Sequence, residues 1–433
     1  MRPAVVLATV GSLGDLHPFI ALGCALRRQG ANVVVASAAE YRAKVECAGL
    51  GFRPVRPSFE DMQRELGMDR AELTSAILAR GDFLLRRLIM PYLRVGYDDM
   101  MTIVAGADLV LTSSLAFGAR LAAERLKIPW IGVVLQPLMF LSAVEPPEIP
   151  RAEWLTALLR RLGPRPTRWV LRLFKWAIGR QLRPVHALRA TIGLPPLRVD
   201  PLFEGQFSSA GAIGLYSPLL GGPQSDMPRP TAIVGFAHFD SEDGGPAALE
   251  ASLGEFLRAG PPPLVFTLGS LIVHSPGSFY RESVQAAREL GLRAVLLVGE
   301  DAVPAYADAA SAAVHVCGYA PHSLLFPRAA AIVHQGGIGT LAQALRSGRP
   351  QLIVPFYADQ LDNAARARRL GVARMVAPRH YAARTAVREL GLLMRLPDHR
   401  ARAVLVGQRL AHEHGAMQGA LAALASIRGR HAP

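Results

Sequence analysis

Short apolar runs recur along the chain, and helical patterns separate them. They cover residues 4–11, 32–38, 109–114 and 130–136 in the first half, and 263–269, 293–299, 314–318, 330–334 and 351–356 in the second. Segments that are apolar on both faces suit parallel strands covered by helices on both sides. The alternation therefore predicts an α/β fold built from βαβ units.

The length of the chain and the distribution of Pro and Gly predict two domains. The chain has 433 residues, whereas a single domain usually has about 100–150. We predict a first domain over 1–215, a Pro- and Gly-rich linker over 216–235, a second domain over 236–410 and a C-terminal helix over 411–433 that can pack back on the first domain. Both domains are predicted to be Rossmann-like, with doubly wound parallel sheets. Ligands bind outside the carboxyl ends of such strands, so we predict that the two sheets face each other across a cleft.

The composition narrows the class of protein. Lys plus Arg total 48 against 34 Asp plus Glu, so the formal net charge is +14, and only three of the basic residues are lysines. This charge can attract an anionic substrate or a membrane surface, and no signature supports a nucleic-acid partner. Cys24, Cys47 and Cys317 provide neither a disulfide framework nor a metal-binding spacing, which fits the cytoplasm. The sequence has no signal-peptide pattern and no apolar run long enough to span a membrane, so we expect neither a signal peptide nor a membrane-spanning helix.

Residues 151–183 are both basic and aromatic. The segment contains nine basic residues and a single acid, Glu153. It also contains Trp154, Trp169, Phe174 and Trp176. A helix pair of this composition fits an anionic lipid surface or a lipid-like ligand. An ordinary helix pair with a solvated basic face is the alternative. We therefore consider a cytoplasmic protein with peripheral association at the inner membrane.

The strongest chemical signal lies within residues 318–364. There a strand-like run ends in His334, and the Gly-rich turn that follows opens a helix. Gly336, Gly337 and Gly339 would let the backbone approach a ligand, and a helix N-terminus with its free N–H groups suits a diphosphate. Thr340 adds a hydroxyl, and His334 can donate to a phosphate oxygen. A simple turn is the alternative if this motif is taken alone.

Three ordered pieces of this segment resemble the signature of the UDP-glycosyltransferase-like superfamily, the inverting, metal-independent glycosyltransferases of the GT-B fold. They are the residues 319–322, 334–340 and 359–364, which read YAPH, HQGGIGT and DQLDNA. The resemblance implies a nucleotide sugar as co-substrate, with Tyr319 and His322 near the nucleoside and the Gly-rich turn at the diphosphate. It implies that Asp359 and Gln360 contact the sugar.

The first loop and the strand over 263–270 also resemble the family. This resemblance implies donor contacts for Ser12, Gly14, Gly269 and Ser270. The same resemblance implies that residues 1–215 form the acceptor-binding domain and that residues 236–410 form the nucleotide-sugar-binding domain.

An inverting transfer needs a base that takes the proton of the acceptor hydroxyl. The family's loop histidine aligns with Asp15 in the sequence GDLHP, and its acidic partner falls on Ser113 or Ser114. The resemblance therefore implies that Asp15 is the catalytic base. The alternative is that Asp15 caps a helix over residues 17–28.

The acceptor is expected to be hydrophobic and to carry the reacting hydroxyl. His17, Phe140 and Trp154 are its predicted contacts. No D-x-D sequence is present, so no metal is expected, and no cofactor beyond the nucleotide sugar.

Within the superfamily, the pieces most resemble the rhamnosyltransferase chains B of bacterial rhamnolipid synthesis. This implies a dTDP-L-rhamnose donor and a hydroxy-fatty acid acceptor. The glutamate that grips the ribose hydroxyls in many relatives is replaced by Gln343, or by Ala342 in the plant-type alignment, which favours a deoxyribose-containing donor. The alternatives are UDP-glucose or another dTDP-sugar with a polyketide, phenolic or sterol acceptor, and a catalytically silent accessory or binding protein.

Overall fold

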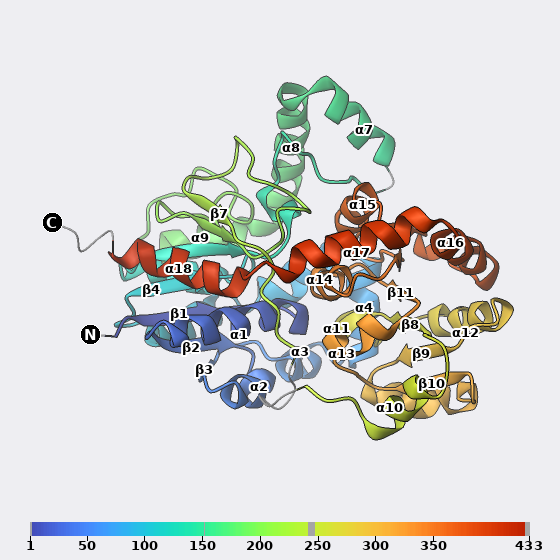
Figure 1. Cartoon of the computed structure of the whole chain (residues 1–433). Helices are drawn as coiled ribbons and strands as arrows, with labels where there is room; N and C mark the ends of the chain where they lie inside the picture. The colour runs from blue at the N-terminus through green and yellow to red at the C-terminus, as the bar shows by residue number, and fades with distance from the viewer. Residues whose placement is uncertain (1, 151, 241–246, 429–433) are drawn as a thin grey trace. The chain divides into compact units, whose positions relative to one another are not determined.

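The computed structural model describes residues 2–150, 152–240 and 247–428, and Figure 1 shows the course of the chain. The chain forms two compact units. Unit 1 contains residues 1–69, 79–239 and 414–433, and unit 2 contains residues 70–78 and 240–413, where described. Each unit has a wholly parallel sheet among its described residues. The predicted α/β class with two parallel sheets is therefore confirmed.

The sheet of unit 1 has seven strands in the order β3-β2-β1-β4-β5-β6-β7. The bounds are β1 (Ala4–Ala8), β2 (Asn32–Ser37), β3 (Gly51–Pro54), β4 (Leu109–Thr112), β5 (Trp130–Val134), β6 (Ala212–Gly214) and β7 (Thr231–Ile233). Strands β1, β2, β4 and β5 correspond to the four predicted apolar runs. The other three were not predicted: β3 and β7 are not fully buried, and β6 has only three residues.

The segment expected to link the domains contains β7. Residues 231–233 pair in parallel with residues 212–214 of β6, so this part of 216–235 extends the sheet of unit 1. The chain passes between the units after Asp69, Leu78, Phe239 and Glu413.

Helices of unit 1 connect these strands. They are α1 (Leu13–Arg28), α2 (Arg42–Cys47), α3 (Phe59–Leu66), α5 (Leu93–Ile103), α6 (Phe117–Arg125), α7 (Glu153–Leu162), α8 (Pro164–Gly179), α9 (Arg183–Thr191) and α18 (Gly415–Arg428), with the short helices η1 (Ala39–Tyr41), η2 (Leu84–Ile89), η3 (Pro137–Phe140) and η4 (Arg180–Leu182). Within the C-terminal helix expected over 411–433, residues 415–428 form α18, and residues 429–433 lie outside the described part. Helix α18 packs against α1 (Figure 1). In this contact Gly419 lies beside Leu22.

The sheet of unit 2 has six strands in the order β10-β9-β8-β11-β12-β13. The bounds are β8 (Leu264–Thr267), β9 (Ala294–Leu297), β10 (Val314–Cys317), β11 (Ala331–His334), β12 (Gln351–Ile353) and β13 (Ala373–Met375). Alternate residues of one strand enter different clusters: Phe266 packs in one core and Val265 in another. Apolar side chains therefore fill both faces, which explains the uninterrupted apolar runs.

Helices of unit 2 cover this sheet. They are α4 (Arg70–Ala79), α10 (Ala251–Arg258), α11 (Gly269–Ile272), α12 (Phe279–Glu289), α13 (His322–Leu325), α14 (Ile338–Arg346), α15 (Gln360–Arg369), α16 (Ala383–Arg395) and α17 (Pro397–Ala411), with η5 (Glu300–Ala309), η6 (Phe326–Arg328) and η7 (Pro378–His380). Helix α4 comes from the first part of the chain. It joins unit 2 near α11, where the Oγ atoms of Ser75 and Ser275 lie 2.9 Å apart.

Candidate functional site

Three neighbouring strands of unit 2 end side by side. His334 of β11 pairs with Thr267 of β8 and with Ile353 of β12. Because all strands are parallel, the segments that follow them meet at one edge of the sheet. The predicted donor residues of 269–270, 334–340 and 359–360 therefore gather at this edge.

His334 is fully enclosed at the end of β11. Its Nδ1 accepts the N–H of Gly336 at 3.0 Å, so Nε2 carries the proton and donates to Oε1 of Gln351, also at 3.0 Å. Burial lowers the pKa of His334 to about 4, so the ring is neutral at physiological pH. In this arrangement neither ring nitrogen is left for a phosphate oxygen. His334 instead holds the turn in shape, which differs from the predicted donor contact.

The Gly-rich turn leads directly into helix α14. Gly336 has φ +87°, and a Cβ there would lie 2.7 Å from Cγ2 of Ile353. Gly337 is the N-cap of α14 and provides no side-chain cap, and Gly339 lies in the first turn. The N–H groups at this helix start are therefore available to an anion. Thr340 is buried and its hydroxyl accepts a 3.4 Å hydrogen bond from Gln335.

The residues after β8 and β12 complete this edge. Gly269 has φ +66°, and Ser270 beside it is exposed. Gln360 uses Oε1 to accept the N–H groups of Phe356 and Tyr357, at 2.8 and 3.1 Å, and so fixes the loop after β12. Asp359 accepts a 2.6 Å hydrogen bond from Asn363. The same Nδ2 of Asn363 donates to the carbonyl of Gly336 and ties this loop to the turn.

Tyr319 and His322 follow strand β10, further along the same edge. The hydroxyl of Tyr319 donates to Asp240 at 3.1 Å, and the other oxygen of Asp240 accepts the N–H of Ser323. The rings of Tyr319 and His322 stack with centroids 6.0 Å apart. Burial lowers the pKa of His322, whose Nδ1 lies 2.9 Å from the carbonyl of Ala320.

Asp15 lies in unit 1, in the first turn of helix α1. The helix begins at Leu13 and not near residue 17, because Ser12 is its N-cap. Asp15 is the third helical residue, so the expectation that it is itself the N-cap is wrong. It closes a capping box: the N–H of Ser12 donates to Oδ2 of Asp15 at 2.9 Å, and Ser12 Oγ accepts the N–H of Gly14 at 3.3 Å. Ser12 and Gly14 are thus bound to each other within this cap.

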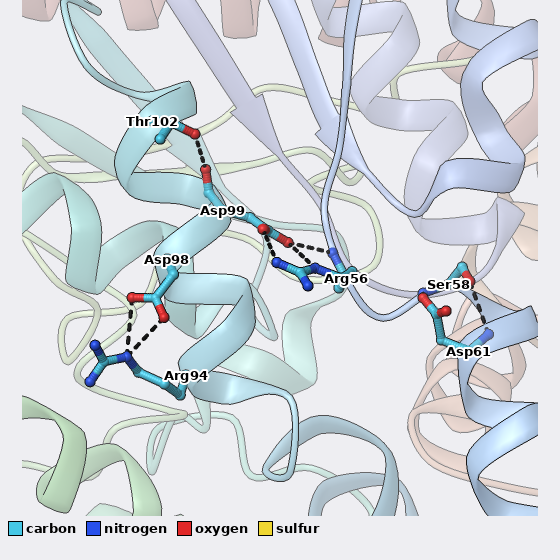
Figure 2. Close-up of polar contacts among 7 residues, drawn as sticks. All are labelled: Arg56, Ser58, Asp61, Arg94, Asp98, Asp99 and Thr102. Atoms are coloured by element: carbon cyan, nitrogen blue, oxygen red, sulfur yellow. Dashed lines mark hydrogen bonds and ion pairs between the residues drawn. The ribbon is translucent and has the colours of Figure 1, made fainter.

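A second capping box in unit 1 shows what the cap alone does to a carboxyl group. Ser58 and Asp61 begin helix α3 with the same spacing, and Figure 2 shows them together. The N–H of Ser58 donates to Oδ2 of Asp61 at 3.0 Å, and this backbone hydrogen bond lowers the pKa of Asp61. At Asp15, burial outweighs the same hydrogen bonding and raises the pKa to about 6. The raised pKa therefore comes from the position of Asp15 and not from its role as a cap.

A small apolar pocket of about 50 Å³ lies next to the loop that leads from β1 into α1, the helix that carries Asp15. Its lining includes Val10 from that loop and Phe117 from α6. Arg56, another lining residue, forms a paired contact with Asp99 of α5: Nη2 to Oδ1 at 2.6 Å and Nε to Oδ2 at 3.0 Å (Figure 2). This ion pair fixes the segment after β3 against α5 and keeps the pocket wall in place.

Comparison with known proteins assigns both halves of the chain to one class of enzyme. Residues 5–137 match the glycosyltransferase family 28 N-terminal domain, and residues 286–416 match the erythromycin biosynthesis protein CIII-like C-terminal domain. Over 385 residues the chain is 32% identical to the O-mycaminosyltylonolide 6-deoxyallosyltransferase of Streptomyces fradiae, covering 86% of this chain and 85% of that enzyme. The chain belongs to this family of glycosyltransferases.

Other relatives agree. The glycosyltransferase is 30% identical to the vancomycin aglycone glucosyltransferase of Amycolatopsis orientalis over 375 residues, which cover 85% of this chain and 84% of that enzyme. Its fold matches the solved structure of the glycosyltransferase VinC in complex with dTDP, with a TM-score of 0.65 at 20% identity over 98% of this chain and 100% of that one. The predicted superfamily and GT-B fold are confirmed, and the closer likeness to rhamnosyltransferases stays a prediction.

The three predicted acceptor contacts of the glycosyltransferase lie in different surroundings. His17 is half-buried in α1, with its ring 5.6 Å from that of Phe239. Phe140 is buried in η3, where it stacks on Phe207 at 5.4 Å. Trp154 is 69% exposed on α7 and lines neither of the two pockets described here.

Several residues that hold the site were not identified from the sequence. Arg120 of α6 is buried, and its Nη1 donates to the carbonyls of Ser113 and Ser114 at 3.2 and 3.0 Å. Burial lowers the pKa of Arg120 to about 9. Gln351 and Asp240 support the predicted donor residues His334 and Tyr319, and no local sequence pattern marks them, because these partners lie on other strands and loops. Gln335 lies within the Gly-rich turn itself and donates to Thr340.

Two further features are absent from the described residues of the glycosyltransferase. Within residues 2–150, 152–240 and 247–428, no three His, Cys, Asp or Glu side chains are grouped as a metal site would require. None of the helices in the same ranges has both the length and the apolar character needed to span a bilayer.

Proposed function

We propose that this glycosyltransferase moves a sugar, with inversion, from a nucleotide diphosphate to a hydroxyl of a hydrophobic acceptor, and that Asp15 is the base. The position of Asp15 is the main support. Oδ2 is held by Ser12, whereas Oδ1 makes no hydrogen bond to any described residue. A carboxylate fixed through one oxygen, with a pKa of about 6, can use the other to accept a proton near neutral pH.

The proposed transfer is a single displacement at C1 of the sugar. The acceptor O–H bond breaks and its proton passes to Asp15, while the acceptor oxygen forms a bond to C1 of the sugar. The bond between C1 and the diphosphate oxygen breaks, and its electron pair leaves with the nucleotide. The N–H groups at the start of α14 and the hydroxyl of Ser270 would receive that charge, so the reaction needs no metal. His334 and Gln360 act as positioning residues in this scheme.

For the donor we propose a dTDP-sugar, with dTDP-L-rhamnose as the specific candidate. Gln343 in α14 supports a deoxyribose, because no carboxylate stands there to bind two ribose hydroxyls. Its Oε1 is buried and has no partner among the described residues, so one acceptor for a sugar hydroxyl remains available. The dTDP in the VinC structure is a second support. UDP-glucose and other dTDP-sugars are the alternatives.

Thermal shift with dTDP, UDP, GDP and ADP at equal concentration tests the donor. A nucleotide at about 100 times its dissociation constant should stabilise the protein by about 2.7 kcal/mol. We expect dTDP to raise the melting temperature most. A larger shift with UDP would contradict the deoxyribose assignment. No shift with any nucleotide, together with no sugar transfer, would favour the catalytically silent binding protein.

For the acceptor we propose a large apolar molecule with a free hydroxyl. The names of the relatives, a tylonolide glycosyltransferase and a vancomycin aglycone glucosyltransferase, support a natural-product aglycone. A hydroxy-fatty acid, as in rhamnolipid synthesis, remains the second candidate. Incubation with dTDP-rhamnose and a panel of both classes, followed by mass spectrometry of the products, distinguishes them.

We also propose peripheral association with an anionic membrane through α7 and α8. These helices pack on each other and present Trp154 and Trp169, each more than two-thirds exposed. Arg151, the first residue of the basic segment, lies outside the described residues. Co-sedimentation with phosphatidylglycerol vesicles, against phosphatidylcholine vesicles as control, tests this association. Equal recovery with both lipids would contradict it.

A further inference from the structure

A pocket of about 650 Å³ opens in unit 1 between helix α8, the start of α9 and the segment 198–204. It is separate from the small apolar pocket beside Asp15, and the two share no lining residue. Its apolar part includes Phe140, Leu141 and Leu171, which are all buried. Around this part stand cationic side chains, so the pocket combines an apolar floor with a positively charged rim.

The acids of the same pocket neutralise only one cation of the rim. Three acids line the pocket: Glu204 forms an ion pair with Lys175, and the other two accept hydrogen bonds from unit 1. Glu204 pairs with Lys175 at 2.6 Å, and Asp226 accepts the hydroxyl of Ser142 and the N–H of Ala143, both at 2.7 Å. Asp200 accepts two backbone N–H groups through Oδ1.

Five guanidinium groups of the lining have no carboxylate partner among the described residues. They are Arg168, Arg172, Arg180, Arg183 and Arg198. Two of them are held by neighbouring aromatic rings: Arg172 lies 5.4 Å from the ring centre of Trp169, and Arg180 lies 4.9 Å from that of Trp176. A planar guanidinium binds a carboxylate through two parallel hydrogen bonds. Several unpaired guanidinium groups around one apolar floor therefore suit a ligand that has both a carboxylate and an apolar body.

The pocket lies at the same edge of the sheet as the proposed base. Phe140 follows strand β5 and Asp15 follows strand β1, and only β4 stands between these strands. All three strands are parallel, so both residues belong to the carboxyl edge. The floor of the pocket and the proposed base therefore both follow strands that end at this edge of the sheet of unit 1.

We infer that this pocket binds a carboxylate of the acceptor, so that the acceptor is an amphiphilic acid that carries its reacting hydroxyl apart from the carboxyl group. The inference rests on the proposed function and adds a chemical class to it: the acceptor is acidic. An acid of a natural-product aglycone and a long-chain hydroxy acid both meet this description.

The experiment compares 10-hydroxydecanoate with its methyl ester by isothermal titration of the full chain, because the two share the hydroxyl and the alkyl chain and the ester carries no charge. At low ionic strength the acid should bind about 10-fold more tightly than the ester, and the difference should shrink in 0.3 M NaCl, where screening is stronger. The double variant Arg172→Gln/Arg183→Gln should bring the ratio of the two affinities close to one. The control Arg161→Gln/Arg165→Gln removes the same charge from exposed positions that do not line the pocket and should keep the ratio.

The outcomes separate this inference from the proposed function. Equal affinity for acid and ester, or no binding of either, contradicts the acidic acceptor. An equal loss in both double variants assigns the effect to net charge and also contradicts it. Binding of phosphatidylglycerol vesicles without binding of 10-hydroxydecanoate would mean a lipid headgroup site instead. In each case a thermal shift with dTDP, measured on the same samples, tells whether the donor site and the glycosyltransferase proposal stand.

Discussion

The backbone N–H of Ser12 donates to Oδ2 of Asp15 across 2.9 Å, so the residue that closes the start of helix α1 is also the proposed base. Gly11 makes this arrangement possible. Its φ is +144°, and a Cβ at this position would collide with the carboxylate of Asp15. The carboxylate is therefore positioned by the helix start itself.

Replacing Asp15 by Asn should lower turnover by about 10²-fold or more, because the amide cannot take the acceptor's proton. The amide oxygen can still accept the N–H of Ser12, so the melting temperature should change little. Asp61→Asn is the matched control, since Asp61 has the same place in the capping box of α3. Measured kcat should be normal in that variant. Equal kcat values in the Asp15 and Asp61 variants would leave Asp15 as a cap only.

The reaction should slow in acid. With a pKa of about 6, Asp15 is mostly ionised at pH 7 and mostly protonated at pH 5, so kcat/KM should fall roughly 10-fold between them. A profile of kcat/KM from pH 5 to 8 measures this. A profile that stays flat down to pH 5 would mean that no group with this pKa acts as the base.

The raised pKa of Asp15 should slow the reaction in acid but should make the folded protein more stable there. Folded Asp15 binds a proton near pH 6, whereas the unfolded chain does so only near 3.8. The contribution of Asp15 to the free energy of unfolding therefore rises as the pH falls through 6, and it is complete below 3.8. Asp15→Asn should remove this contribution, which denaturant unfolding at pH 7 and pH 5 can measure. An unchanged pH dependence in the variant would contradict the raised pKa.

His334 should make the fold less stable in acid. Its pKa is about 4 in the folded chain and 6.5 in the unfolded one, so the unfolded chain binds more protons between these values. Stability should fall as the pH drops from 6.5 to 4. His334→Gln should remove this loss, at the cost of a lower stability at pH 7 because the hydrogen bonds with Gly336 and Gln351 are disturbed. Denaturant unfolding of both proteins across this range is the measurement, and parallel curves would contradict the buried neutral histidine.

Gly336→Ala should weaken nucleotide binding and destabilise the protein by about 1–3 kcal/mol, since the turn requires a positive φ and has no room for a Cβ. Gly391→Ala is the control, because Gly391 lies in helix α16 with open space around it. That change should be neutral or stabilise by about 0.5–1 kcal/mol. Thermal unfolding and dTDP titration measure both effects. A neutral Gly336 variant would show that the turn is not tightly held.

Turnover should survive an excess of chelator. The leaving group's charge is assigned to the start of α14 and to Ser270, and neither needs a divalent cation. Assays with and without 10 mM EDTA, about the usual excess over trace metal, test this. Complete loss of activity that Mg²⁺ or Mn²⁺ restores would overturn the metal-independent mechanism.

The sequence predicted the buried strands well because each is apolar on both faces of its sheet. Strands β3, β7 and β13 were not predicted because most of their residues are only partly buried or exposed, so they are not apolar on both faces. Strand β6 is buried but has only three residues. The start of α1 was placed near residue 17, although Ser12 caps the helix. Local patterns therefore predict fully buried strands better than partly exposed strands and helix ends.

The candidate site was predicted less completely than the fold. His334 was expected to face a phosphate, but its partner Gln351 lies 17 residues away on the neighbouring strand. The raised pKa of Asp15 could not be foreseen either, because Asp61 has the same spacing from its serine and a lowered pKa. Pairing between strands and depth of burial are properties of the folded chain, and no short motif encodes them.

Helix α18 follows unit 2 in the sequence but packs on α1 of unit 1, where Gly419 lies beside Leu22 and Leu215. During synthesis, the residues that cover this face of α1 are therefore made only after those of unit 2. Domains usually fold in the order in which they are translated. Here unit 1 cannot complete its packing before residue 413 of unit 2 has been made, and the apolar surface around Leu22 stays uncovered by α18 until then.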